Sequence, residues 1–472
     1  MKNVIRNFFY QSVFQLMKIV IPIITIPIVS KVLGPSGIGL YNYTNSIAQY
    51  FVLVASLGVV MYGNREIALA YNRKEDISTL FWELFSFKAI LAIVVLVIYY
   101  TLVSFFPNRI ILYIQGLTIF SVLFDISWFF MGIEDFKKTS MCNLLVQFVT
   151  FVAIIFLVKD SNDTIVYTFI QSLGLVFSQL LVWFFIKPYI KFQRINLLSS
   201  FKHLKGSFEF FIPQVAIILY TNLNKTLLGF FIGSTAVGYY TNSLTLNTVF
   251  ITIITTLDIV LLPHMSGLFA KDNIEKIVTL MNKTLHLQLF FSIPLMFGML
   301  TVYDKLVPWF FGNKFLYINN IIPYFSLLIV VVPLGAAISR QYLIPIGKVR
   351  EYNKSVIFGA VINIISNSIL LPTIGFFGVV ISNILSEVFV TVTRSKSFIE
   401  QTNFKFDTKK IFLFFISALV MMISTRFLTK DMSANLYTNI FQVIIAFCIY
   451  IFLTSITKVN PLMKMIKWRN KK

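Results

Sequence analysis

Long runs of apolar residues recur from one end of the chain to the other, and they restrict the fold more than any other feature. One of them, AILAIVVLVIYYTLVSFF, runs from Ala89 to Phe106 without a charged residue. A helix needs about 20 mostly apolar residues to cross a lipid bilayer. Only 12% of the 472 residues are charged, whereas soluble proteins carry roughly 25%. The sequence therefore predicts an all-α polytopic membrane protein.

Turn residues and charge clusters divide the apolar sequence into about 14 predicted transmembrane helices. Near the N-terminus, Gln11, Gln15 and Lys18 interrupt the apolar stretch, so we interpret it as the first span rather than as a cleavable signal. The predicted helices cover residues 8–30, 38–62, 81–105, 110–131, 141–158, 164–186, 207–232, 238–262, 285–304, 318–339, 353–371, 376–393, 411–428 and 436–456.

Positive charge is distributed unevenly between the two sides of these predicted helices. With the N-terminus placed in the cytoplasm, 30 of the 40 Lys and Arg residues fall in cytoplasmic segments, seven fall in external segments and three lie inside spans. Such a bias orients membrane proteins, so we predict that both termini are cytoplasmic. The net charge of +21 is explained by this topology and by anionic lipid headgroups. We therefore expect membrane lipids, and no nucleic acid, as partners.

A short internal repeat links two distant turns of the chain. LGPSGIGLYNYTNS resembles IGSTAVGYYTNSLT, so that Gly34 aligns with Gly233 and Gly39 with Gly238, 199 residues apart. Each copy joins two predicted spans on the external side, which indicates a repeat about an axis along the membrane normal.

The repeat predicts two pseudo-symmetric six-helix bundles plus two C-terminal helices. We expect the N-terminal bundle at residues 1–187, a cytoplasmic linker at 188–206 and the C-terminal bundle at 207–396. Residues 397–472 would form the two extra helices and a basic cytoplasmic tail. Repeats of this kind usually build transporters that move two bundles around a central path.

Several classes of function lack support in the sequence. The predicted external loops are too short for a catalytic domain, and no cytoplasmic loop holds a Walker sequence or a cluster of carboxylates. The two Cys and three His residues are scattered, without the spacing of metal ligands. We therefore expect no catalytic residues, no metal, no cofactor and no enzyme activity.

Polar side chains mark one face of four predicted spans. An ionisable residue inside a span costs roughly 2.5–3.5 kcal/mol on insertion scales and normally faces a bundle interior or a water-filled cavity. Two lysines, Lys18 and Lys225, lie inside spans that end at the repeated turns. We predict a hydrophilic central cavity that binds substrate through Lys18, Lys225, Gln11, Gln15, Asn45, Gln49, Thr245 and Thr252.

Both a functional and a structural interpretation of these residues remain open. Two lysines suit an anionic headgroup such as a pyrophosphate, but polar side chains also hold membrane helices together through hydrogen bonds. The acidic residues Asp125, Asp258 and Glu387 are candidates for ion coupling, although each could equally cap a helix or pair with a cation. We expect the ammonium group of Lys88 to snorkel towards the cytoplasmic surface.

Several segments resemble Wzx-type polysaccharide flippases of the multidrug/oligosaccharidyl-lipid/polysaccharide exporter superfamily. They include KVLGPSGIGLYNYTNSIAQYFVLVASLGVVMYGNREIA, DISWFFMGIEDFKKTS, TNLNKTLLGFFIGSTAVGYYTNS and QYLIPIGKVREYNKSVIFGAVINIISNSILLPTIGFFGVVISNILSE, in order over about residues 1–400. The resemblance implies a V-shaped pair of bundles and alternating access.

The resemblance also implies a substrate and a setting. The substrate would be a polyprenyl-pyrophosphate-linked oligosaccharide repeat unit, moved from the cytoplasmic to the external leaflet of a bacterial inner membrane. Such transport serves capsular polysaccharide, exopolysaccharide or O-antigen-type biosynthesis, with the polysaccharide polymerase machinery as a candidate partner.

Two other functions are weaker alternatives. A cation-coupled multidrug exporter of the same superfamily would favour acidic and aromatic residues that hold organic cations, whereas the charges predicted in this cavity are basic. A membrane polysaccharide polymerase or glycosyltransferase would need acid and base groups on a substantial loop, and the short external loops argue against it.

Overall fold

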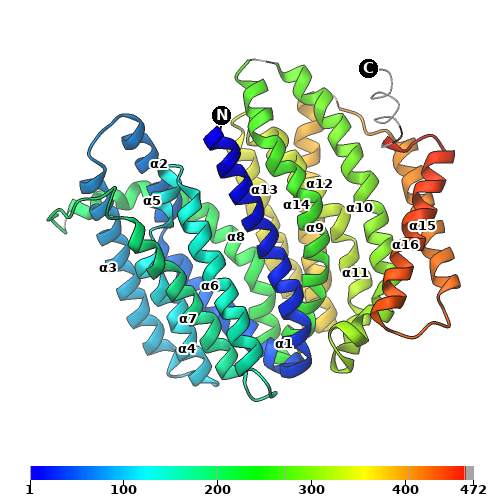
Figure 1. The fold of residues 1–472 in the computed structure, drawn as a ribbon, viewed down its shortest axis with the longest axis horizontal. Coiled ribbons are helices and arrows are strands. Elements are labelled where there is room, and N and C mark those ends of the chain that lie inside the picture. Colours follow the sequence, from blue (N-terminus) through cyan, green and yellow to red (C-terminus); the bar gives the residue numbers. More distant parts are fainter. Residues whose placement is uncertain (1, 198, 272, 403, 462, 464–472) are drawn as a thin grey trace. The chain divides into compact units, whose positions relative to one another are not determined.

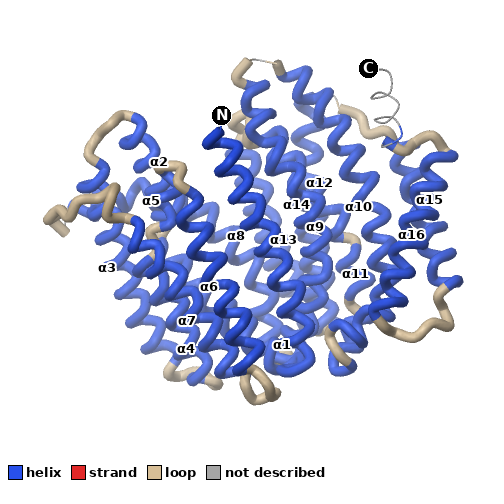
Figure 2. Tube along the Cα trace, in the orientation of Figure 1, coloured by secondary structure: helices blue, strands red, loops and turns tan. Residues whose placement is uncertain are grey.

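The chain is built from helices throughout its described part, as a computed structural model shows (Figure 1). The structure describes the backbone of residues 2–197, 199–271, 273–402, 404–461 and 463, and the side chains of these residues except 2–20, 22, 259 and 263. Helices and loops alternate along the trace, and no strand occurs in these ranges (Figure 2). The predicted all-α class is confirmed.

The chain divides into two compact units, and the first comprises Met1–Gly238. It contains α1 (Lys2–Ser56), α2 (Val59–Asn72), α3 (Ile77–Val103), α4 (Arg109–Phe124), α5 (Ser127–Gly132), α6 (Phe136–Leu157), α7 (Thr164–Val182), the 3₁₀ turns η1 (Trp183–Phe185) and η2 (Ser199–His203), and α8 (Leu204–Phe231).

The second unit comprises Tyr239–Lys472. It contains α9 (Ser234–Phe269, whose first turn belongs to the first unit), α10 (Ile274–Phe310), η3 (Asn313–Asn320), α11 (Ile322–Ser326), α12 (Leu328–Ile338), the π-helical segment η4 (Ser339–Leu343), α13 (Val349–Ile374), α14 (Phe376–Thr402), α15 (Thr408–Leu428) and α16 (Leu436–Ile456).

The compact units divide after Gly238, whereas the repeat placed the bundle boundary at residues 188–206. Helix α8 packs against α1 and α2, and it is therefore part of the first compact unit. The division into six-helix bundles at 1–187 and 207–396 stays a prediction, because compact units and symmetry-related bundles are defined by different criteria.

Eleven segments of the described chain are long and apolar enough to cross a membrane. One of them, Ile23–Asn72, is 50 residues long and includes parts of two predicted spans, and Arg109–Phe124 is a further, shorter apolar helix. Every predicted span is mostly helical, although 38–62 and 110–131 each cross a break between two helices, and the number of helices is roughly consistent with the expected 14.

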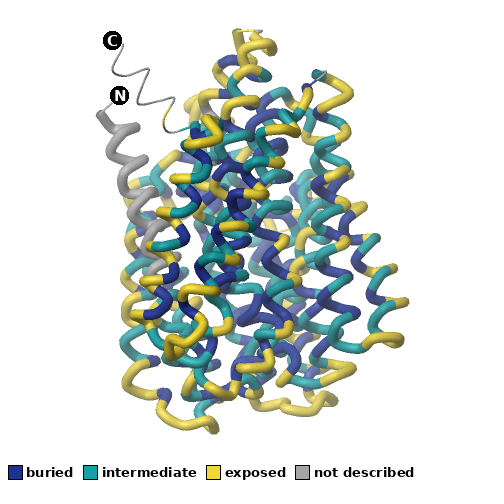
Figure 3. The backbone as a smooth tube through the Cα atoms, turned by 90° about the vertical axis from the view of Figure 1, so that its right-hand side faces the viewer, coloured by how far each residue is buried: buried dark blue, intermediate teal, exposed yellow. Residues whose placement is uncertain are grey.

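The exposed surface of the helices is also that of a membrane protein. Large apolar side chains are exposed along many helices, for example Phe184 at 76% and Phe447 at 62%. Exposed positions recur along the helices in Figure 3, where they are yellow. A soluble protein rarely leaves so many such residues in water, so these faces are suited to contact lipid. Each unit buries apolar clusters of its own, including one around Phe81, Trp128 and Phe129 in the first unit.

The two repeated turns share an unusual backbone conformation. Gly34 has φ 66° and interrupts the helical geometry of α1, and Gly233 has φ 117° directly before α9. Both angles lie in the region that glycine adopts without strain and that side chains disfavour. The repeat therefore extends from the sequence to the backbone.

The two turns also contact each other, within the first unit. A Cβ atom added to Gly39 would lie 1.7 Å from the carbonyl oxygen of Ser234, and one added to Gly238 would lie 2.0 Å from that of Pro35. Pro35 and Ser234 occupy equivalent positions of the repeat. Each copy thus packs its glycine against the same position of the other copy, as in a self-complementary twofold contact.

Candidate functional site

The structure describes only part of the polar face of the first predicted span. The side chains of Gln11, Gln15 and Lys18 lie outside the described residues. Thr25, on the same predicted face, donates a hydrogen bond to the carbonyl oxygen of Ile21 at 2.8 Å. It lines a cavity of about 200 Å³ between α1, α6 and α7. The cavity is also lined by polar groups of Gln147, Thr150, Tyr167 and Gln171.

Asn45 belongs to a hydrogen-bond network between α1 and α4. Its Nδ2 atom donates to Oε1 of Gln115 at 3.4 Å, and Nε2 of Gln115 donates to Oγ1 of Thr44 at 3.4 Å. Gln115 is fully buried. These contacts favour a structural role for Asn45 in holding α1 against α4, while Gln49 lies half-buried one turn later in α1.

Lys225 lies half-buried in α8 beside the contact of this helix with α1. The hydroxyl group of the next residue, Thr226, lies 2.9 Å from that of Ser46 and 3.0 Å from that of Tyr50. Lys225 itself donates through Nζ to Oδ1 of Asn222 at 3.3 Å. No carboxylate of a described residue forms an ion pair with it. Among the described residues, the ammonium group of Lys225 therefore has a neutral partner.

The threonine stripe of α9 bonds to its own helix. Thr245 donates to the carbonyl oxygen of Thr241 at 2.8 Å, and Thr252 donates to that of Thr248 at 2.7 Å. This i to i−4 bonding occupies the hydroxyl hydrogen. The two side chains can therefore still accept a hydrogen bond from a ligand, but they do not donate one in this conformation.

Asp125, a candidate for ion coupling, is paired with a lysine. Its Oδ2 atom lies 3.8 Å from Nζ of Lys88, and Oδ1 accepts a hydrogen bond from the backbone N–H of Ser127 at 2.9 Å. Lys88 is fully buried and also donates to the carbonyl oxygen of Asp125. The expectation that Lys88 snorkels is wrong, because α3 presents it to the break between α4 and α5, where it finds its partner.

Asp258 and Glu387 belong to the second unit and lie in different surroundings. Glu387 is half-buried in α14. Asp258 of α9 is fully buried and accepts hydrogen bonds through Oδ1 from Nε2 of Gln288 at 2.5 Å and of Gln341 at 2.6 Å. Sequence reasoning missed both glutamines. Their signal was an amide group inside a predicted span and another at the end of one.

An apolar cavity of about 350 Å³ lies between α9, α10, α15 and α16 in the second unit. Aromatic and aliphatic side chains form its walls, among them Phe250, Phe290, Met421, Phe447 and Tyr450. The sequence did not indicate this cavity, because apolar residues of α10 and α16 look the same whether they face lipid, protein or a ligand.

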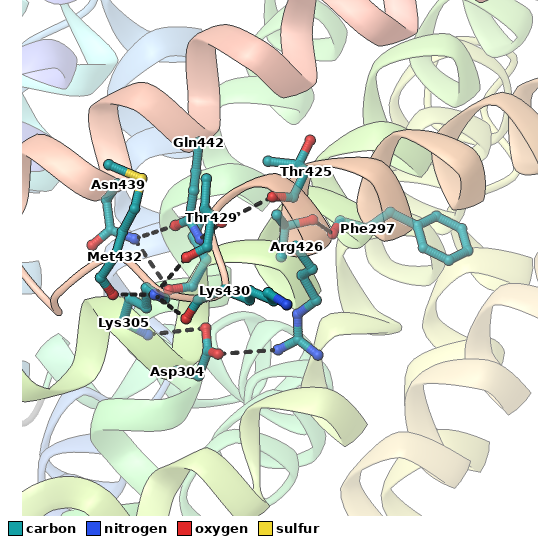
Figure 4. A network of polar contacts seen from close by, with 12 residues as sticks. Phe297, Asp304, Lys305, Thr425, Arg426, Thr429, Lys430, Met432, Asn439 and Gln442 are labelled. Carbon is teal, nitrogen blue, oxygen red and sulfur yellow. Dashed lines mark hydrogen bonds and ion pairs between the residues drawn. The ribbon is translucent and has the colours of Figure 1, made fainter.

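A polar network joins the α15–α16 loop to the C-terminal part of α10 (Figure 4). The ammonium group of Lys305 donates to the backbone carbonyl oxygens of Thr429 at 2.6 Å, Lys430 at 3.1 Å and Met432. Backbone carbonyls at a helix end need such donors. Lys305 therefore holds α15 and the start of α16 in position relative to α10.

Comparison with known proteins identifies the family. The family model described as "Polysaccharide biosynthesis protein" matches residues 4–269, more than half of the chain. The chain belongs to this family. The resemblance to Wzx-type flippases of the multidrug/oligosaccharidyl-lipid/polysaccharide exporter superfamily is thereby confirmed.

Two curated relatives are similar to this family member over most of their length. A protein of Escherichia coli (strain K12) named "Putative O-antigen transporter" is 21% identical over 302 residues, which cover 62% of this chain and 73% of the relative. A protein of the same name from Shigella dysenteriae is 21% identical over 384 residues, covering 80% and 95%. Both relatives are named as transporters rather than as catalysts, in agreement with the prediction that the chain is not an enzyme.

Solved structures share the fold of this polysaccharide biosynthesis protein. The lipid II flippase MurJ in an inward closed conformation superposes with a TM-score of 0.78 at 15% identity, covering 96% of this chain and 98% of that chain. An inward-facing MATE family multidrug resistance transporter of the MOP superfamily gives a TM-score of 0.62 at 14% identity, covering 81% and 96%. At such identities the likeness shows the fold alone.

Proposed function

We propose that the protein moves a polyprenyl-pyrophosphate-linked oligosaccharide repeat unit from the cytoplasmic to the external leaflet by alternating access. The observation that carries this proposal is the family match over residues 4–269, together with relatives named as O-antigen transporters. The setting would be the inner membrane of a bacterium, with both termini cytoplasmic. Capsular polysaccharide, exopolysaccharide or O-antigen-type biosynthesis would use the product.

The pyrophosphate of such a substrate needs a cation within or beside the membrane. Lys225 supports this role, because it is half-buried, bonds to the neutral side chain of Asn222 and has no carboxylate partner in the described chain. An ammonium group is a compact point charge that suits phosphate oxygens. Lys18 remains the proposed second cation on the basis of its position in the sequence.

The isoprenoid and glycan parts need different surroundings. The apolar cavity between α9, α10, α15 and α16 has the chemistry for a segment of isoprenoid chain, since its walls are aromatic and aliphatic side chains. The smaller cavity between α1, α6 and α7 carries amide and hydroxyl groups, including those of Gln147 and Gln171, which match the hydroxyl groups of a sugar. We propose each cavity by itself as a contact for the chemical group that its walls match.

The test is a deletion in the native host followed by analysis of lipid-linked sugars in each leaflet. Accumulation of complete repeat units in the cytoplasmic leaflet, with loss of external polysaccharide, is the expected result. Repeat units that reach the external leaflet but stay unpolymerised would contradict flipping and support a polymerase instead. Re-expression of the chain should restore export.

A cation-coupled multidrug exporter is the second candidate, since the fold is also that of a MATE family transporter. Lys225 argues against it, because its ammonium group forms no ion pair with a described carboxylate and a positive charge repels organic cations. Resistance of the host to organic cations, measured with and without the protein, separates the two functions.

A further inference from the structure

Asp258 is a carboxyl group that the protein surrounds with amides instead of a cation. It is 0% exposed, and both of its hydrogen bonds, from Gln288 of α10 and Gln341 of η4, end on Oδ1. The other oxygen, Oδ2, is buried and accepts no hydrogen bond from the described residues. No ion pair joins Asp258 to a described basic side chain.

A second oxygen in the same cluster also has no hydrogen-bond donor among the described residues. Oε1 of Gln288 is buried and has no donor in the described part of the chain. A buried polar atom without a partner costs roughly 1–3 kcal/mol, and an isolated buried carboxylate costs far more. The cluster therefore contains two acceptors without a donor, Oδ2 of Asp258 and Oε1 of Gln288, and one proton shared between them would remove both deficits.

A proton on Asp258 would satisfy both oxygens at once. Oδ2–H would donate to Oε1 of Gln288 while Nε2 of Gln288 donates to Oδ1, which is the cyclic pair that carboxylic acids form with amides. Turning the Gln288 amide by half a rotation would place its oxygen against Oδ1, where it would again need a proton. The acid is thus matched to its neighbour only in the neutral form.

Gln341 cannot provide the missing hydrogen by turning over. In either orientation its amide can bring at most its NH2 group to Oδ1, where Nε2 already lies at 2.6 Å, while its other end contacts the hydroxyl group of Thr284 at 2.6 Å. Gln341 is fully buried and lies in the π-helical segment Ser339–Leu343. Single π-helical turns are rare and occur often at functional sites. The irregular turn is what brings this amide to the acid.

We infer that Asp258 is a proton-binding site, occupied in this conformation by a proton on Oδ2 that bonds to Gln288. The proton enters from water and returns to it when α10 or the π-helical turn moves and the acid becomes accessible. This inference does not depend on which molecule the protein transports, because it concerns the acid and its neighbours alone.

Arg340, next to Gln341 in η4, is a charged neighbour of Asp258, and a cation attracts a carboxylate. Lys283 of α10 and His264 of α9 are exposed, and His286 of α10 accepts a hydrogen bond from the backbone N–H of Asp407. Closer approach of Arg340 would therefore promote release of the proton, and its withdrawal would promote uptake.

Infrared spectroscopy of the purified full chain in detergent at neutral pH tests the inference directly. The wild-type protein should show the carbonyl-stretch band of a protonated carboxylic acid, and Asp258→Asn should lack that band. Asp431→Asn is the control, because Asp431 lies exposed in the α15–α16 loop, so this variant should fold and the band should persist. Identical carboxylic-acid spectra for folded wild type and Asp258→Asn would overturn the inference.

A second variant keeps the test decisive if Asp258→Asn fails to fold. Gln288→Leu removes the acceptor of the proposed O–H group, so the band should move to higher frequency as the hydrogen bond is lost. A band that stays in place, or its absence from the wild-type spectrum, would overturn the inference. Neither measurement requires transport activity.

Discussion

Each unit holds an aspartate among its helices, but the two aspartates have different partners. In the first unit, Asp125 lies between α4 and α5 and faces the ammonium group of Lys88 of α3 at 3.8 Å. In the second unit, Asp258 has two glutamine amides as hydrogen-bond donors and no cation in contact. An ion pair fixes two charges, whereas an acid among amides can bind and release a proton.

The comparison indicates which buried charges hold the fold and which are free to act. Lys88 is occupied by the carboxylate and the carbonyl oxygen of Asp125. Lys225 has a neutral partner instead. Removing the charge of an ion-paired residue such as Lys88 should therefore destabilise the protein. Removing the charge of a residue with a neutral partner, such as Lys225, should impair function instead.

The largest effect should come from breaking the Lys88–Asp125 pair. Lys88→Met leaves a carboxylate without its cation, and removing one partner of a buried pair costs about 3–5 kcal/mol. Thermal unfolding in detergent measures the loss. The double variant Lys88→Met/Asp125→Asn removes both charges and should recover a large part of the stability. Equal stability of the single variant and the wild type would show that the pair does not hold the fold.

Two substitutions of Asp258 should distinguish the need for a hydrogen-bond acceptor from the need for a negative charge. Asp258→Leu leaves the Nε2 groups of Gln288 and Gln341 without an acceptor, at about 1–3 kcal/mol for each buried donor. Asp258→Asn keeps an acceptor and adds a donor for Gln288, so its thermal stability should stay close to that of the wild type. If Asn destabilised the protein as much as Leu, the cluster would need a carboxylate and not a neutral acid.

Lys225 should show the opposite pattern to Lys88. Lys225→Met should leave thermal stability unchanged but weaken substrate binding by roughly 1.5–3 kcal/mol, the range for a hydrogen bond to a charged group. Export of polysaccharide by the native host, normalised to protein level, should fall by about tenfold or more. Lys314→Met, at an exposed lysine of η3 in the second unit, is a matched control that should export normally. Undiminished export by Lys225→Met would exclude Lys225 from the substrate site.

The sequence predicted the helical class well, because the cost of placing a backbone in lipid leaves a strong hydropathy signal. It also located the repeated turns, where Gly34 and Gly233 both have a positive φ. The site was harder to predict. Lys88 was expected to reach the surface, since the sequence does not reveal that α3 faces Asp125.

The surroundings of Asp258 were beyond sequence reasoning for a different reason. Its neighbours Gln288 and Gln341 lie 30 and 83 residues away, and a π-helical turn positions the second of them. No periodic pattern encodes such a turn. The role of a buried polar residue therefore depends on its partners, which only the packing of the helices defines.

A smaller effect is expected from Lys305, a lysine that bonds to carbonyl groups rather than to an acid. Lys305→Met should remove its hydrogen bonds to the α15–α16 loop, at about 1–2 kcal/mol in total after exposure of the freed carbonyls to water. Hydrogen exchange of residues 429–435 should accelerate in this variant. Slow exchange equal to that of the wild type would show that the loop is held by other contacts, such as the 3.7 Å pair of Asp304 and Arg426.

The smallest effect should be a pH dependence centred on His203, which lies outside the membrane helices in η2. Its Nε2 atom lies 3.2 Å from a carboxylate oxygen of Glu83, and Nδ1 lies 3.1 Å from the hydroxyl group of Tyr62. Burial lowers the pKa of His203 below its ordinary value of 6.5, and the carboxylate of Glu83 opposes this shift without cancelling it.

The sign of the effect follows from the lowered pKa. Between the folded and unfolded pKa values the unfolded chain binds more protons, so stability rises with pH across that window. The contribution is complete above about pH 6.5 and is lost as the pH falls towards the folded value. Thermal unfolding of wild type and His203→Gln between pH 7.5 and 5 measures the difference. A wild-type stability that increased on acidification relative to His203→Gln would show that pairing with Glu83 outweighs burial, which would make His203 resemble Lys88 rather than Asp258.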